Sequence, residues 1–110
     1  MATFIMLGSF TDQGIRNVKD TTKRVETVKA AAKKLGITVK EVYWTLGQYD
    51  TALIAEAPDE AAMTAFGLTV GAQGNVRTQT LRAFGAEEMG RILGHLGKTE
   101  IAGTSENLFQ

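Results

Sequence analysis

The stretch ITVKEVYWTLGQYDTALIAEA, residues 37–57, decides the fold of this chain. It holds two runs rich in β-branched, aromatic and aliphatic residues, Ile37 to Leu46 and Thr51 to Ala57, on either side of Gly47-Gln48. Such composition favours β-strands, and a glycine at the first position of a two-residue turn suits a type II′ hairpin. The stretch therefore predicts an antiparallel hairpin in which residue 45 lies opposite 50, 44 opposite 51, 43 opposite 52 and 41 opposite 54.

The segments around this hairpin alternate between strand and helix patterns. Strands are predicted at residues 3–9 and 75–84, and helices from Thr21 or Thr22 to Gly36, from Pro58 to about Val70, and from Ala86 onward. The resulting order is β-α-β-β-α-β with a C-terminal helix, which is the ferredoxin-like α+β plan with an antiparallel four-stranded sheet. We expect one domain over residues 1–98 and a tail over 99–110. Residues 103–110 resemble the remnant of a protease-cleavable tag and are excluded from the functional argument.

Composition narrows the class of protein. The chain has 110 residues, 44% of them apolar, with a net charge of zero and no cysteine. A neutral chain is not typical of a nucleic-acid-binding module, because such modules depend on basic residues that contact phosphates. The lack of cysteine excludes disulfides, thiol nucleophiles and cysteine zinc sites. With no signal peptide or membrane-spanning run predicted, we expect a cytoplasmic protein without membrane contact.

The two strands expected in the middle of the sheet are apolar on both faces. In the first strand, Ile5 and Leu7 alternate with Phe4 and Met6, and the strand from Thr51 to Ala57 follows the same pattern. Helices cover only one face of a ferredoxin-like sheet, so the other face would expose a large apolar patch. We therefore predict that a second copy of the chain covers it, sheet to sheet, as in dimeric α+β barrels, and that a higher oligomer is an option.

Four segments of the sequence resemble the GYD-motif domain family. They are Phe10-Thr11-Asp12-Gln13-Gly14-Ile15, Gly47-Gln48-Tyr49-Asp50, Glu56-Ala57-Pro58-Asp59, and the strand from Arg77 to Phe84. The resemblance covers about residues 3–97. It implies a small bacterial or archaeal protein of the dimeric α+β barrel kind, and it implies no established catalytic activity.

The Gly47, Tyr49 and Asp50 motif raises the question of a catalytic pair. Alternation along the hairpin predicts that Tyr49 and Asp50 point to opposite faces of the sheet, Tyr49 with Trp44 and Asp50 with Tyr43 and Glu56. Tyr49 is expected to pack. Two roles are open for Asp50. In the first, its carboxylate is satisfied within the protein, by turn amides or by an arginine; in the second, it lines a polar pocket.

The fourth strand supplies the other candidates for a ligand site. If its threonines and Arg82 face the same cavity as Glu56, they form a small site for an anionic or carbonyl ligand. If the residues of this strand alternate in the opposite sense, Arg77 and Gln79 are exposed instead of the threonines, and Arg82 is a surface or interface residue. The candidate ligand-binding residues are therefore Tyr43, Asp50, Glu56, Thr78, Thr80 and Arg82.

No cofactor and no metal site are expected. His95, the one histidine, is predicted to be solvated, although some dimeric α+β barrels hold haem through a late histidine. No nucleophile elbow or Ser-His-Asp order is present. We expect a homo-oligomeric small-ligand-binding or assembly module. The alternative is a monooxygenase- or isomerase-like enzyme that uses Tyr43, Asp50 or Glu56 as acid or base on a small organic substrate, and the sequence leaves open whether the protein is an enzyme.

Overall fold

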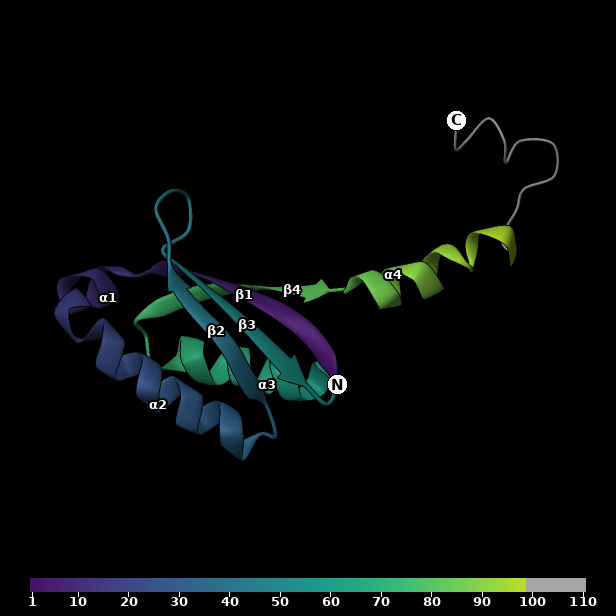
Figure 1. The fold of residues 1–110 in the computed structure, drawn as a ribbon. Helices are drawn as coiled ribbons and strands as arrows, with labels where there is room; N and C mark the ends of the chain where they lie inside the picture. Colours follow the sequence, from purple (N-terminus) through teal and green to yellow (C-terminus); the bar gives the residue numbers. More distant parts are fainter. Residues whose placement is uncertain (99–110) are drawn as a thin grey trace.

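The computed structural model describes residues 1–98, so the predicted tail and tag remnant, residues 99–110, lie outside the described part (Figure 1). The elements are β1 (Ala2–Phe10), α1 (Asp12–Arg16), η1 (Val18–Asp20), α2 (Thr21–Lys34), β2 (Thr38–Trp44), β3 (Thr51–Ala57), α3 (Glu60–Ala72), β4 (Val76–Ala83), α4 (Ala86–Leu93) and η2 (Leu96–Lys98), where η denotes a 3-10 helix. The strands form one antiparallel sheet in the order β2-β3-β1-β4. This confirms the predicted ferredoxin-like α+β fold.

Local sequence determines where the helices begin and end. The carboxylate of Asp59 accepts a hydrogen bond from the amide of Ala62 at 2.8 Å and caps α3. The hydroxyl of Thr11 caps α1 in the same way. Helix α2 ends just before Gly36, whose φ of +75° is a left-handed conformation that favours glycine. Gly36 lies at the predicted end of α2, and α3 begins at Glu60, two residues after the predicted start at Pro58.

One face of the sheet is covered by α2 and α3 (Figure 1), and the core lies between the helices and this face. Alternate residues of β1 and β3 point into it and meet an apolar side of α3. The buried hydrophobic residues are Phe4, Met6, Ala32, Ile37, Leu53, Ala55, Ala57, Met63, Phe66 and Val70.

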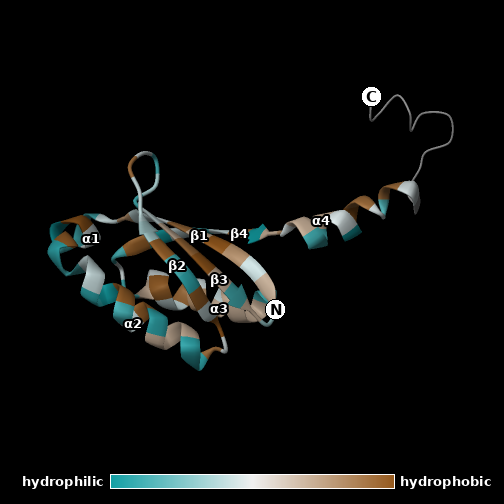
Figure 2. Ribbon diagram, in the orientation of Figure 1, coloured by the Kyte–Doolittle hydropathy of each residue, from teal (hydrophilic) through white to brown (hydrophobic). Residues whose placement is uncertain are grey.

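The other face of the sheet carries no helix (Figure 1), and we call it the open face. Its central apolar residues alternate with the buried ones and lie opposite each other across the strands; they are Ile5, Leu7, Tyr43, Ala52, Ile54 and Leu81. Tyr43 is 51% exposed and Leu81 is 40% exposed. Strands β1 and β3 are correspondingly hydrophobic over much of their length (Figure 2). The predicted apolar second face is present, whereas the second copy expected to cover it stays a prediction.

The hairpin differs from the prediction at its turn. Strand β2 ends at Trp44 and β3 begins at Thr51, so residues 45–50 form a loop rather than a two-residue turn. The Thr45 amide donates to the Asp50 carbonyl at 2.8 Å, and the Thr45 hydroxyl donates to the Tyr49 carbonyl at 2.6 Å. Gly47 still has a positive φ of +130°. The predicted pairing of residue 44 with 51, 43 with 52 and 41 with 54 is confirmed.

Helix α4 continues from β4 away from the sheet and the other helices (Figure 1). It is amphipathic, with hydrophobic and hydrophilic residues alternating along the ribbon (Figure 2). Met89 and Leu93, one helical turn apart, are 43% and 52% exposed. The apolar stripe of α4 therefore remains largely uncovered within the described part of the chain.

Candidate functional site

The candidate ligand residues lie on both faces of the sheet. Tyr43 and Glu56 are on the open face, as their register partners show. Thr78, Thr80 and Arg82 are on the helix-covered face of β4, opposite the buried side of β1. The structure thus brings the two threonines and Arg82 together but separates them from Glu56. A single cavity lined by Glu56 and these three residues is not formed.

Asp50 holds the hairpin loop to the end of β1. Its carboxylate accepts a hydrogen bond from the Phe10 amide at 2.8 Å, and its own amide donates to the Gly8 carbonyl at 2.8 Å. This is the amide-accepting role that the sequence offered as one of two alternatives for Asp50. A partly buried carboxylate that accepts a backbone N–H is satisfied without any ligand.

Tyr49 lies on the face opposite to the predicted one. Its hydroxyl donates to Oε1 of Gln79 at 2.6 Å, and Gln79 is on the open face. Trp44, its expected companion, is on the helix side, where its indole N–H donates to the Thr21 hydroxyl at 3.0 Å. The prediction failed because regular strand alternation stops at Thr51, and the loop does not continue it.

Arg82 has several partners and connects β4 to α4. Its Nη2 lies 2.9 Å from Oε2 of Glu88, and its Nη1 donates to the Thr3 carbonyl at 3.2 Å. The guanidinium carbon also lies 5.6 Å from the ring centre of Phe4 and 4.6 Å from that of Phe84. The hydrogen bond from Arg82 lowers the pKa of the Glu88 carboxyl below its ordinary value, and the positive charge of Arg82 adds to this effect.

A groove of about 440 Å³ lies between α3 and β4. Thr78, Thr80 and Arg82 form its β4 side, and Glu60 and Thr64 line it from α3. Three hydroxyls, a carboxylate and a guanidinium along an open groove are able to hydrogen-bond a small polar molecule. Much of the donor capacity of Arg82 is already used by Glu88 and the backbone. The groove is therefore more a hydroxyl-lined surface than a strong anion site.

The apolar stripe of α4 is a feature that the list of candidate site residues did not include, whereas the apolar second face was predicted from the sequence. The apolar pattern of β1 and β3 signalled the open face. The spacing of Met89, Ile92 and Leu93 signalled an amphipathic helix, but not that this helix leaves the body of the protein.

No metal or membrane feature is found in the described residues. Within residues 1–98, no group of three or more histidine, aspartate or glutamate side chains is placed to hold a metal ion. His95 is exposed just after α4, and its backbone amide donates to the Ile92 carbonyl at 3.0 Å. In this same part of the chain, no helix has the length and apolar character needed to cross a bilayer.

Comparison with known proteins gives two findings. The GYD domain, as a family, matches residues 4–93. The glutamine synthetase and cystathionine beta-lyase binding protein of Thermus thermophilus is 33% identical over 84 residues, which is 76% of this chain and 88% of that protein. The name of this relative describes a protein that binds two enzymes.

Proposed function

The chain belongs to the GYD domain family, and we propose that it is a non-catalytic, homo-oligomeric assembly module whose open face binds a second copy of the chain. The observation that carries the proposal is the apolar open face, with Ile5, Ile54 and Leu81 opposite one another across three strands. Monomeric proteins rarely leave such a contiguous apolar surface in water.

The arrangement of residues on the open face supports a symmetric dimer. Polar residues lie around the apolar centre, with Glu41 on β2 and Arg77 and Gln79 on β4. An apolar centre with a polar rim is typical of protein interfaces. A two-fold axis that runs between two sheets and parallel to them would pair this surface with itself, which is the commonest arrangement in homodimers.

Native mass spectrometry tests the dimer. The proposal predicts a dominant species at twice the chain mass of 11.8 kDa, stable on dilution to low micromolar concentration. A spectrum with only the monomer at tens of micromolar would show that the open face is not a dimer interface.

We also propose that the module binds a further protein through α4. The relative named for binding two enzymes supports this role. The stripe formed by the exposed Met89 and Leu93 and the half-buried Ile92 is a surface that an apolar groove of another protein would cover. The experiment measures binding of the wild type and of Leu93→Asp to immobilised glutamine synthetase and cystathionine beta-lyase. Binding of the wild type to at least one enzyme, weakened tenfold or more in Leu93→Asp, is expected. Binding to neither enzyme would remove this part of the proposal.

Small-ligand binding in the groove between α3 and β4 is a second candidate, favoured by the convergence of Thr64, Thr78 and Thr80. A co-purifying small molecule seen by mass spectrometry and lost in Thr80→Val would support it.

The enzyme alternative would need acid and base groups around one pocket. Asp50 instead binds a backbone amide, and Glu56 lies 3.6 Å from Lys40 on the open face. We therefore propose no reaction.

A further inference from the structure

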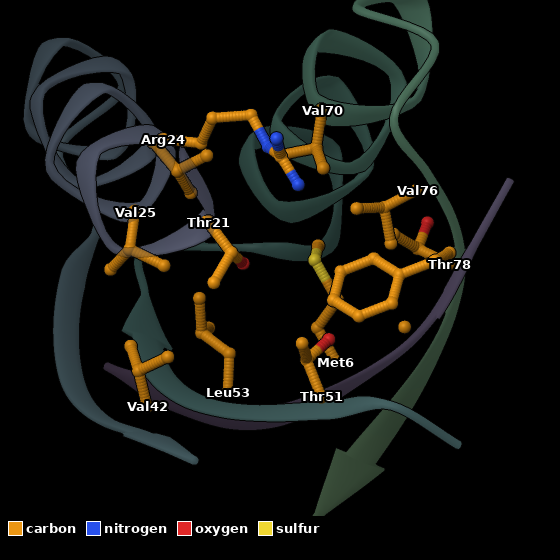
Figure 3. Close-up of a pocket in the computed structure, with 13 residues that line it drawn as sticks. Met6, Thr21, Arg24, Val25, Val42, Thr51, Leu53, Val70, Val76 and Thr78 are labelled. Atoms are coloured by element: carbon orange, nitrogen blue, oxygen red, sulfur yellow. The ribbon is translucent and has the colours of Figure 1, made fainter. Parts of the chain in front are cut away.

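A cavity of about 70 Å³ lies between the sheet and helices α2 and α3 (Figure 3). It is on the helix side of the sheet, so a second copy on the open face would not cover it. Its walls are mainly apolar and come from six elements, namely the four strands and helices α2 and α3. They include Met6, Val25, Val28, Leu53, Val70 and Val76.

Gly8 of β1 lies in the cavity wall between Met6 and Phe10, and the side chains of Thr51 and Val76 close in on it. A Cβ on Gly8 would lie 2.4 Å from Oγ1 of Thr51 and 2.7 Å from Cγ1 of Val76, so no larger residue fits there without displacing them. Protein interiors are normally packed to the density of organic crystals, and a void larger than a water molecule is uncommon. An apolar space of this size is more suited to a small apolar group than to ordered water.

Arg24 supplies the one guanidinium in the cavity wall. It is half-buried and its end lies beside Val70 (Figure 3). Its Nη1 donates to the Asn17 carbonyl at 2.6 Å and its Nη2 to the Gly14 carbonyl at 3.4 Å. Among the described residues, no carboxylate lies within 4.0 Å of the Arg24 guanidinium. Arg82 and Arg91, in contrast, each pair with a glutamate.

The position of Arg24 has a chemical consequence. A guanidinium has five N–H donors in a planar fork, and the two carbonyls hold it in place while leaving donors free. A partly buried cation next to apolar walls gains from an anionic partner, and a carboxylate matches the fork. The hydroxyls of Thr21, Thr51 and Thr78 add weaker hydrogen-bonding groups to the wall.

We propose that this cavity binds a short, branched aliphatic carboxylate, with its hydrocarbon body among the valines and its carboxylate on Arg24. The volume limits the ligand. An apolar cavity of about 150 Å³ holds the six carbon atoms of benzene, so a space about half as large accepts roughly three carbon atoms. A long fatty acid is too large, and a phosphate lacks the apolar body that the walls require.

The test is a methyl NMR titration of the full chain with 2-methylpropanoate. Saturable shifts of the Met6, Val28 and Val70 methyl signals are expected, with a dissociation constant of about 1 mM for so small a ligand. The neutral amide of the same acid should bind at least tenfold more weakly. Octanoate should not bind in this cavity.

Two variants and a control locate the ligand. Arg24→Met should weaken binding at least tenfold, whereas Arg16→Met, which changes an exposed arginine outside the cavity, should not change it. Val28→Phe should fill the space and abolish binding, and it provides an independent test if Arg24→Met fails to fold. Absence of saturable shifts in the wild type, equal binding of acid and amide, or unchanged binding in either cavity variant would each overturn the proposal.

Discussion

Replacing Ile54 with aspartate is predicted to separate the proposed dimer without unfolding the protomer. Ile54 is in the middle of β3 on the open face, opposite Ile5 on one side and Glu41 on the other. In an isolated protomer the new carboxylate would reach water, because no helix covers this face (Figure 1). In a sheet-to-sheet dimer it would be buried beside an apolar surface and near the carboxylate of Glu41.

The magnitude follows from symmetry. Burying an unpaired charge costs about 3 kcal/mol or more, and a two-fold interface contains the substitution twice. The total of about 6 kcal/mol corresponds to a dimer dissociation constant raised about 10⁴-fold. A dimer held together at micromolar concentration would then be monomeric under all ordinary conditions.

Sedimentation equilibrium measures this change, and circular dichroism shows whether the variant is folded. Leu68→Asp is the matched control, because Leu68 is 70% exposed on α3 and lies away from the open face. Ile54→Asp should sediment as a folded monomer and Leu68→Asp as the wild-type species. If Ile54→Asp keeps the wild-type mass, or if both variants dissociate equally, the reasoning from the open face is wrong.

Two further predictions concern packing and pH. Gly14→Ala should lower the free energy of unfolding, measured by chemical denaturation, by about 2 kcal/mol or more, because a Cβ there would lie 1.9 Å from the Asn75 carbonyl oxygen. The control is Gly90→Ala, whose Cβ would meet nothing within 4 Å and which should be neutral or stabilising. Glu88 should titrate below the ordinary carboxyl pKa of 4.5, and its pKa should rise towards that value in Arg82→Gln, as followed by carboxyl NMR. Because the pKa of Glu88 is lowered in the folded state, the Arg82–Glu88 pair contributes to the stability of the fold above the ordinary pKa, and this contribution is lost as the pH falls through the native pKa. A Glu88 pKa that did not change in Arg82→Gln would show that Arg82 is not the cause of the shift.

The regular elements of the fold were predictable from local pattern. The alternation of apolar residues gave the strands and the pairing of Trp44 with Thr51. Pro58 indicated the start of α3 to within two residues, and Gly36 indicated the end of α2. These features depend on residues close together in sequence, and the structure adds little to them.

The candidate site was less predictable, because it depends on how separate strands align. The face on which Thr78 and Thr80 lie is fixed by the register of β4 against β1, which no local pattern encodes. Tyr49 lies on the face opposite to the predicted one because β2 ends and β3 begins farther from Gly47-Gln48 than a two-residue turn requires. The cavity at Arg24 is lined by residues of two helices and four strands, and no single segment of the sequence indicates it.

Contacts between two copies of the chain across the open face are detected by isotope-filtered NOE spectra of a sample that mixes labelled and unlabelled chains. If a second copy covers the open face, intermolecular NOEs are expected from the methyl groups of Ile5 and Ile54 to Tyr43 and Leu81 of the other copy, and none from the methyl groups of Val28. Open-face methyl groups that show only intramolecular NOEs and full broadening by a soluble paramagnetic agent would contradict this arrangement.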